Sequence, residues 1–283
     1  MSRAITRQVA LLLALLLALF TLGCTDTPDA DLRITVIDVG QGDATLLSQA
    51  GRHMLIDTGS AYAADALLRE LEANGVKKLD LLVLTHPHED HVGNARRLLM
   101  ELEVETLVVP TDIAVDFGYD LVLATARERC DDLRVVCAGD EIVLGDARCT
   151  VLYAQVNAED WNDASIVLRV EYGETALLFM GDAGAKIEAE LLRKMPQLLD
   201  CDFLRVGHHG SEDATTGAFL SAATPTLAAV GCGEQNTYGF PHAAVLENLD
   251  VMGVRVWRTD LDGTVVFISD GENIRFHSKS KGA

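Results

Sequence analysis

A largely apolar run at residues 79–84 leads directly into the segment Thr85-His86-Pro87-His88-Glu89-Asp90-His91. A run of this kind predicts a strand that is buried on both faces of a sheet. The segment that follows places three imidazoles and a carboxylate at the exit of that strand, where the backbone can hold them rigidly. Clustered imidazoles have no packing use there, whereas imidazole nitrogens and carboxylate oxygens are the ligands that a divalent cation such as zinc requires. We therefore expect a sheet whose edge presents a metal site.

Short β-rich runs alternate with amphipathic helical stretches from residue 33 onwards. No long linker, repeat or block of like charge interrupts this alternation, which is typical of one domain of about 250 residues. The patterns predict helices at residues 61–74, 121–129, 186–194 and 243–252, and strands that include 34–39, 53–56, 79–84, 135–137, 150–153, 175–180, 203–206 and 227–230. Two β-rich halves with helices between their strands predict an α/β fold of two packed sheets flanked by helices.

The first residues are typical of an export signal. Arg3 and Arg7 precede an apolar run at residues 9–20 that is too short for a comfortable membrane span. The next residues, Thr21-Leu22-Gly23-Cys24, resemble the lipobox of bacterial lipoproteins, in which the cysteine is lipid-modified and begins the mature chain. We expect a signal peptide at residues 1–23, lipid attachment at Cys24, a polar linker at 24–32 and a folded domain at 33–283.

A lipid on Cys24 would tether that domain to a membrane, at the periplasmic or the cell surface. Two alternatives stay open for the same residues: an ordinary signal peptide that happens to contain a cysteine, and an uncleaved anchor. An exported domain can hold disulfides, and the sequence predicts one between Cys130 and Cys137. Cys149 and Cys201 lie in apolar runs and are expected to be small buried side chains.

The sequence is strongly acidic, with 23 basic and 43 acidic residues and a formal net charge of −20 at pH 7. A field of this sign repels polyanions, which argues against a broad surface for binding nucleic acid. A polyanionic substrate would have to be captured by a local basic or metal-bearing site.

The segment from His86 to His91 matches the HxHxDH signature of the metallo-β-lactamase superfamily. This resemblance implies a four-layer αββα sandwich, an α/β or α+β fold, with one or two metal ions in a cleft at the edge of its two sheets. It also implies that His86 and His88 hold one metal, and that Asp90 and His91 hold the other.

Five further segments narrow the resemblance to one branch of that superfamily. They are Asp38-Val39-Gly40-Gln41-Gly42-Asp43-Ala44, Leu55-Ile56-Asp57-Thr58-Gly59, Gly181-Asp182, His208-His209-Gly210-Ser211 and Asn236-Thr237-Tyr238-Gly239-Phe240-Pro241-His242. In this order and spacing they resemble the extracytoplasmic hydrolase domain of ComEC-type competence proteins, over nearly the whole mature chain. The expectation is a free-standing relative of that domain.

The resemblance implies roles for individual residues. Asp182 is expected to bridge two metals, and either His208 or His209 to complete the second site. We favour His209 as the ligand and His208 as a contact to substrate phosphate. Asp57 is expected to orient the His-rich loop from behind, and Asn162 to face the opening of the first site.

The position of the imidazoles bears on which metal is bound. No histidine lies between His91 and His208, although true metallo-β-lactamases take a third ligand for the first metal from that interval. The first site is then expected to consist of His86, His88, Asp182 and water. This set is rich in oxygen, which makes manganese nearly as good a fit as zinc.

The expected chemistry is metal-assisted hydrolysis, with Asp90 taking a proton and His208 or His242 donating one. We expect a phosphodiester substrate outside the cytoplasm, either single-stranded DNA or a smaller phosphodiester. Two departures from the ComEC-type pattern put DNA in doubt: Phe240 stands where the family has histidine, and Glu212 and Asp213 add negative charge.

Two other functions stay open at this point. One is a hydrolase of a small phosphoester or a lactone, which the acidic surface favours. The other is a surface lipoprotein with a degenerate, non-catalytic site, which the loss of histidine at Phe240 suggests. The sequence gives no indication of the oligomeric state.

Overall fold

The computed structural model describes residues 30–113 and 115–280, and the described residues from Asp31 onwards form one compact unit. The expected signal peptide at residues 1–23, Cys24 and most of the expected linker lie outside the described residues. The first strand begins at Leu32, one residue before the expected start of the domain. Within the described part of the chain, no helix has both the length and the apolar character needed to cross a membrane.

The first of two sheets contains both ends of the folded unit. Among the described residues its strands follow the order β15 (Ile274–Ser280), β14 (Thr264–Ser269), β1 (Leu32–Val36), β2 (Thr45–Gln49), β3 (Arg52–Ile56), β4 (Lys78–Val83), β5 (Glu103–Val109) and β6 (Asp132–Val135). Strands β3 to β6 are mutually parallel, whereas the other neighbours in this sheet are antiparallel. Parallel strands need crossover connections, and helices supply them here.

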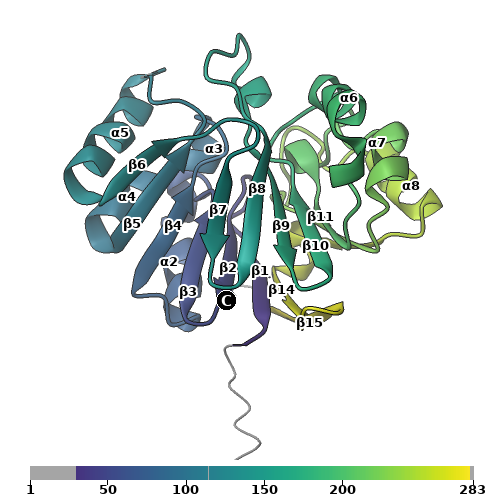
Figure 1. Ribbon diagram of the computed structural model, residues 1–283, viewed down its shortest axis with the longest axis horizontal. Helices are drawn as coiled ribbons and strands as arrows, with labels where there is room; N and C mark the ends of the chain where they lie inside the picture. Colours follow the sequence, from purple (N-terminus) through teal and green to yellow (C-terminus); the bar gives the residue numbers. More distant parts are fainter. Residues whose placement is uncertain (1–29, 114, 281–283) are drawn as a thin grey trace, which may run out of the picture. The chain divides into compact units, whose positions relative to one another are not determined.

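Helices cover the outer face of this sheet (Figure 1). They are α2 (Ala64–Ala73), α3 (Glu89–Val92), α4 (Ala95–Glu101) and α5 (Phe117–Arg129), and a 3-10 turn at Ala61–Ala63 precedes them. Their apolar faces form one buried cluster with the sheet, in which Leu67 and Leu71 of α2 and Leu98 of α4 join Leu82 of β4. The spacing of four residues from Leu67 to Leu71 puts both side chains on one face of α2, as the sequence predicts.

The second sheet is built in the same way. Among the described residues its order is β13 (Arg255–Arg258), β12 (Leu227–Val230), β11 (Phe203–Arg205), β10 (Thr175–Phe179), β9 (Val167–Tyr172), β8 (Ala147–Tyr153) and β7 (Glu141–Leu144). Its outer face carries α6 (Ala185–Lys194), α7 (Gly217–Ala223) and α8 (Ala243–Val251), and a short α9 (Thr259–Asp262) follows β13. Shorter turns lie at Trp161–Ala164, Pro196–Leu198 and Gly207–Gly210.

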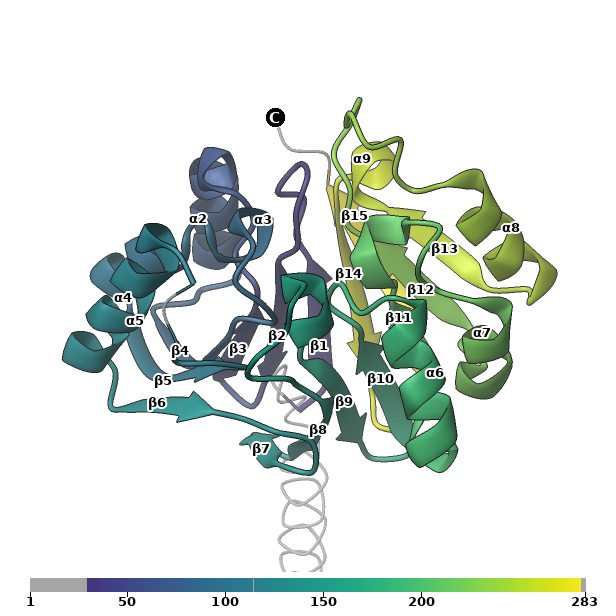
Figure 2. The same cartoon turned by 90° about the horizontal axis from the view of Figure 1, so that it is seen from above.

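The two sheets pack face to face, with the helices on the outside of both (Figure 2). The inner faces share one large apolar cluster, in which the ring of Phe203 from β11 lies 5.0 Å from that of Phe267 from β14. This arrangement is the four-layer αββα sandwich that the sequence predicts, and it confirms the expected fold class.

The parallel pairing of β10 with β11 places the chemistry at one edge of the second sheet. Phe179 pairs with Arg205, so the segments after the two strands, which carry Asp182 and His208, leave the sheet side by side. The His-rich loop leaves β4 of the first sheet in the same region, because Ile166 donates a backbone hydrogen bond to Thr85 across the two sheets at 2.9 Å. Residues from both halves of the sequence therefore meet at one edge of the sandwich.

The structure corrects two expectations about residues 130–137. The strand expected at 135–137 lies at Asp132–Val135, and Cys130 and Cys137 are free thiols. An extended strand rises about 3.3 Å per residue. Since β6 runs between the two cysteines, it keeps them too far apart for a disulfide, which needs Cα atoms within about 7 Å. Cys149 and Cys201 are buried, as expected.

Candidate metal centre

His86, His88 and Asp182 form the first of two clusters that meet at Asp182, and a third group that could hold an ion consists of Asp43, Asp57 and His91. His86 and Asp182 are buried, and the Nε2 atom of His86 lies 3.6 Å from Oδ2 of Asp182. The same Nε2 atom is 3.1 Å from Nδ1 of His88. Extended backbone puts residues two apart on one side, which is why His86 and His88 point to a common centre.

Asp90, His91 and His209 form the second cluster. The Nε2 atom of His209 lies 3.3 Å from Oδ2 of Asp90. Asp90 and His91 belong to α3, which starts immediately after His88, and the ring of His91 lies 4.1 Å from that of His86. His209 comes from the 3-10 turn after β11.

Asp182 lies between the two clusters and turns one carboxylate oxygen to each. Its Oδ2 atom faces His86, whereas its Oδ1 atom lies 3.2 Å from Nε2 of His91 and 3.7 Å from Nε2 of His209. The side chain of Ser165 fixes this loop by accepting a hydrogen bond from the backbone N–H of Asp182 at 3.0 Å. This placement is what a carboxylate that bridges two cations requires.

The buried polar atoms of the centre test whether the donor set fits metal ions. His91 Nε2, His209 Nε2 and Asp182 Oδ1 are buried and have no hydrogen-bond partner among the described residues. A buried polar atom without a partner costs free energy, so such atoms are rare unless something else satisfies them. All three belong to ligand types of divalent cations and converge on one region, so the residues present fit a metal centre.

A carboxylate behind His91 sets the orientation of that ring. The Nδ1 atom of His91 donates to Oδ2 of Asp57 at 2.7 Å, which leaves Nε2 facing the centre. The other oxygen of Asp57 accepts the backbone N–H of Thr85 at 2.7 Å. Asp57 thus ties the His-rich loop to the end of β3, in the place that the sequence predicts for it. Such a partner fixes the tautomer and the ring orientation of a ligating histidine.

His209 is held in the same way by residues that the sequence analysis missed. Its Nδ1 atom donates to the carbonyl oxygen of Gly231 at 2.9 Å and lies 3.2 Å from Oδ1 of Asp43. Asp43 is itself paired with the buried guanidinium of Arg205. A signal for this pair exists in the sequence, because Arg205 is a charged residue inside the apolar run of β11 and stands four positions before His209.

Attraction between the imidazoles and the carboxylates of the centre shifts the pKa values of His91, His209 and Asp182. Burial disfavours the charged form of His91 and His209, but the carboxylates around them dominate. Asp182 and Asp57 raise the pKa of His91 well above its usual value, and Asp182 and Asp43 raise the pKa of His209 to about 10. Burial also opposes ionisation of Asp182, yet the neighbouring imidazolium charges, led by that of His91, hold its pKa well below the usual range.

His86 and Asp90 shift in opposite directions. Burial, assisted by the charge of His91, lowers the pKa of His86 well below its usual value, so this imidazole is neutral at pH 7. Burial raises the pKa of Asp90, but the adjacent His209, 3.3 Å away, and the charge of His91 outweigh it and lower the pKa to about 2.

The structure separates the roles of the neighbours His208 and His209. His208 belongs to neither cluster, since its Nε2 atom is 3.9 Å from Oδ2 of Asp182 and its Nδ1 atom is 3.1 Å from Oδ1 of Asp213. Both residues adopt left-handed backbone conformations, with φ of 48° and 52°. Strain of this kind persists where the surroundings fix it, and here it points consecutive side chains in different directions.

A cleft of about 580 Å³ opens onto both clusters. Its lining consists of Gln41, Ser60, His88, Glu89, Asp90, Asn162, Asp182, His208, His209, Tyr238 and Phe240. Asn162 lies there as expected, and its buried Oδ1 atom has no hydrogen-bond partner in the described part of the chain.

His242 is not among the described residues that line this cleft, and its expected role as a proton donor stays a prediction. Within the described residues the lining stops at Phe240. The Nδ1 atom of His242, the residue immediately before α8, accepts the backbone N–H of Glu212 at 2.9 Å, so its ring turns back toward that loop. Its ring packs edge-on against Phe240 at 5.2 Å, so it does not replace the imidazole that Phe240 displaces.

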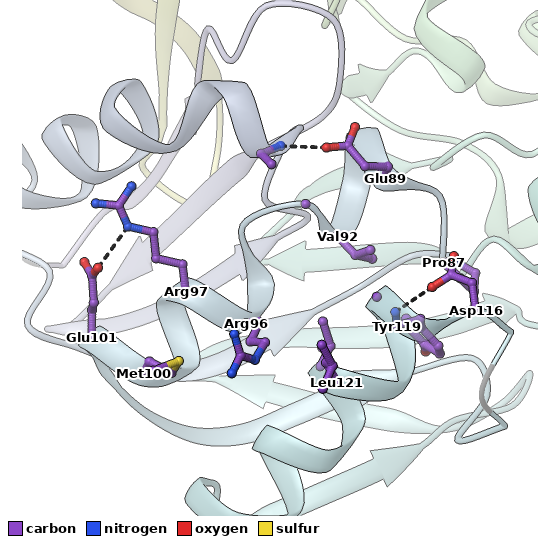
Figure 3. Close-up of a pocket in the computed structure, with 14 residues that line it drawn as sticks. Pro87, Glu89, Val92, Arg96, Arg97, Met100, Glu101, Asp116, Tyr119 and Leu121 are labelled. Atoms are coloured by element: carbon purple, nitrogen blue, oxygen red, sulfur yellow. Dashed lines mark hydrogen bonds and ion pairs between the residues drawn. The ribbon is translucent and has the colours of Figure 1, made fainter.

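A second cavity of similar size, about 590 Å³, lies on the other side of the His-rich loop between α4 and α5 (Figure 3). Pro87 and Glu89 of the loop line it, together with Arg96 of α4 and Leu121 of α5. None of the candidate metal clusters found among residues 30–113 and 115–280 contributes to this lining. The chemistry therefore belongs to the cleft.

Comparison with known proteins places these observations in a family. Residues 37–154 match the metallo-β-lactamase superfamily. The chain is 34% identical over 254 residues to ComE operon protein 3 of Bacillus subtilis (strain 168), covering 83% of this chain and 32% of that protein. It is 34% identical over 241 residues to competence protein ComA of Neisseria gonorrhoeae, covering 85% of this chain and 33% of that protein. The chain thus spans about a third of the length of these curated relatives.

The fold has a counterpart among solved structures. The metallo-β-lactamase fold protein YhfI from Bacillus subtilis superimposes with a TM-score of 0.61 at 14% identity, over 84% of this chain and 100% of that chain. At this level of identity the similarity concerns the fold alone.

Proposed function

Because the chain has the metallo-β-lactamase fold and belongs to that superfamily, we propose that it is a metal-dependent hydrolase and that it cleaves phosphodiesters. The observation that carries this proposal is the position of Asp182, which turns one oxygen to each of two ligand clusters. Three unpartnered buried atoms at the same place support two ions per chain, and zinc and manganese both suit the donor set.

Some residues of the centre would bind the ions, and others orient the side chains that do so. His86, His88 and Asp182 would hold one ion, and Asp90, His91, His209 and Asp182 the other. When bound, the cations supply the Lewis acidity that activates a water and stabilises negative charge on the substrate. Asp57 and Asp43 keep the Nε2 atoms of His91 and His209 directed at the centre. Asp90 lines the cleft beside His209 and is the proposed acceptor of a proton from the attacking water, although its lowered pKa makes it a weak base.

His208 is the proposed donor to the leaving group. It lines the cleft beside Asp182 without joining either cluster, so its ring is available to substrate. Asp213 holds its Nδ1 atom, which directs Nε2 into the cleft. Asp213 is one of the two acidic residues whose charge puts DNA in doubt as the substrate, and it is paired here with His208.

Phosphodiesters are favoured over β-lactams and lactones by two observations. The interval between His91 and His208 contains no histidine, so the first cluster keeps a set of two imidazoles and one carboxylate with room for substrate oxygen. The relatives named for the ComE operon and for competence favour DNA or a nucleotide fragment as the substrate.

We also propose that the hydrolase acts outside the cytoplasm, anchored to a membrane by a lipid on Cys24. Support for this part comes from the sequence pattern of residues 1–24. Mass spectrometry of the mature N-terminus from the native host tests it. A diacylated Cys24 is expected, and a chain that still carries residues 1–23 would contradict the proposal.

The test of activity uses residues 26–283, loaded with zinc or manganese. Cleavage of bis-p-nitrophenyl phosphate and of single-stranded DNA is expected, with loss of both in His88→Ala. His277→Ala is the matched control, because His277 is exposed on β15. Cleavage of the small ester alone would restrict the substrate to short phosphodiesters. Bound metal with neither activity would contradict the proposal and direct attention to lactones.

A further inference from the structure

We propose that Tyr238 is a stacking platform for a flat aromatic group of the substrate, such as a nucleobase, beside the bond that is cleaved. This inference rests on the proposed phosphodiesterase function. It names the part of the substrate that the same cleft would recognise, and the residue that would recognise it.

Three rings form a series that leads from the metal centre to the mouth of the cleft. The ring of Phe240 stacks on that of His209 at 6.2 Å and 29°. The ring of Tyr238 then stacks on Phe240 at 5.3 Å and 13°. Tyr238 is 63% exposed, so Phe240 covers one face of its ring and the other face is open to a ligand. Both aromatic side chains line the cleft that contains Asp182 and His208.

The loop that carries these rings is fixed in place before any ligand arrives. The side chain of Asn236 accepts the backbone N–H of Phe240 at 2.9 Å and donates to its carbonyl oxygen at 2.7 Å. The backbone N–H of His242 donates to the carbonyl of Gly210 at 2.9 Å, which ties the loop to the turn that presents His209. A platform held in this way loses little conformational entropy when a ring stacks on it.

Gly210 shows how closely the loop and the turn are packed. A Cβ atom at this position would lie 2.5 Å from Cβ of Pro241. The backbone of Gly210 also has a φ of +81°, which favours glycine. The distance from the second metal cluster to the platform is therefore set by packed backbone and not by a free loop.

The chemistry of Tyr238 indicates what it would bind. An exposed aromatic ring gains from covering a second flat ring, and stacking tolerates any base because every base has a π face. A base inside a duplex already has both faces covered by its neighbours, so the platform favours single strands and short fragments.

Isothermal titration calorimetry of the zinc-loaded protein tests the platform without relying on turnover. The two probes are thymidine 5′-monophosphate and 2-deoxyribose 5-phosphate, which share the sugar and the phosphate and differ in the base. Wild-type protein is expected to prefer the nucleotide about 5- to 100-fold. Tyr238→Phe should retain this preference, and Tyr238→Ala should lose it. Phe117→Ala is the matched control, since Phe117 is a 78% exposed aromatic on α5, and it should behave as wild type.

Equal affinity for the two probes in wild-type protein would overturn the inference, and so would an undiminished preference in Tyr238→Ala. Cleavage of bis-p-nitrophenyl phosphate, measured on the same preparations, separates this result from the fate of the proposed function. Cleavage without a base preference refutes the platform alone. A base preference that depends on Tyr238 supports the platform even if no phosphodiester is cleaved, and in that case the proposed function fails.

Discussion

Oδ1 of Asp43 lies 3.2 Å from Nδ1 of His209, and the same oxygen is paired with the buried guanidinium of Arg205. This contact links the glycine-rich turn after β1 to the metal centre at the end of β11. The carboxylate of Asp43 therefore both orients the expected ligand His209 and neutralises the charge of the buried Arg205.

Asp43→Asn is expected to lower the affinity of the second cluster for zinc about 10- to 100-fold, because the partner that orients His209 is weakened. The variant also leaves Arg205 buried without an anion, which costs about 3–5 kcal/mol of the free energy of unfolding. Competition with a chromophoric zinc chelator measures the affinity, and urea unfolding measures the stability.

The double variant Asp43→Asn with Arg205→Met separates these two effects. Removal of both partners of a buried ion pair is often nearly neutral, so much of the stability should return. The zinc affinity should stay low, since His209 still lacks its carboxylate. Recovery of the affinity together with the stability would show that Asp43 acts only as a partner of Arg205.

Gly231 is expected to be intolerant of any side chain. A Cβ atom there would collide with the guanidinium of Arg205 and lie 2.6 Å from Oδ1 of Asp43. Overpacking of this kind costs about 1–3 kcal/mol, so Gly231→Ala should lower the midpoint of urea unfolding. Gly217→Ala is the matched control, because nothing lies within 4 Å of its Cβ position at the start of α7. If both variants unfold at the same urea concentration, the packing around Arg205 is looser than described.

Zinc binding is expected to release protons, and its affinity to rise with pH. The pKa of His91 is raised well above its usual value and that of His209 to about 10, so both imidazoles are protonated in the metal-free protein at pH 7. Zinc binds only the neutral form, and it must displace these protons. Calorimetry in two buffers with different ionisation enthalpies should give about two protons per chain at pH 7.

The affinity for zinc should rise with pH because the pKa values of His91 and His209 are raised. Protons compete with zinc less as the pH rises toward the raised pKa of His209, so the affinity should increase throughout that range. His86 contributes no proton at pH 7, because its pKa is lowered. An affinity that does not change between pH 6 and 9 would contradict this description of the charges.

The sequence predicts the parts of this centre that are local and misses those that are distant. His86, His88, Asp90 and His91 stand within six positions at the end of one strand, so their convergence follows from the strand and the short helix after it. Asp182 was identifiable only through the resemblance, because a single aspartate after a strand is as typical of a turn. The pair between Asp43 and Arg205 joins positions 162 apart, and only the packing of the two sheets brings them together.

The differences between expectation and structure have equally physical causes. His242 follows Phe240 by two positions, and in an extended chain both would point the same way, yet only Phe240 lines the cleft. The start of α8 instead turns the ring of His242 to the backbone of Glu212. The disulfide was expected from the short spacing of Cys130 and Cys137 in the sequence. The strand β6 lies between them and holds them apart. The strand β15 was missed because exposed residues alternate along much of it, without an apolar run.

We propose that Asp182 joins two metal sites that act together in hydrolysis. The most direct measurement is the metal content of purified wild type and Asp182→Ala after dialysis against zinc, with cleavage of bis-p-nitrophenyl phosphate assayed on the same samples. Asp65→Ala, whose side chain is 83% exposed in the wild type, is the matched control. We predict about two ions per chain and cleavage in wild type and control, with loss of bound metal and of at least about 99% of the cleavage in Asp182→Ala. Full metal content and full activity in Asp182→Ala would show that Asp182 does not join the two sites.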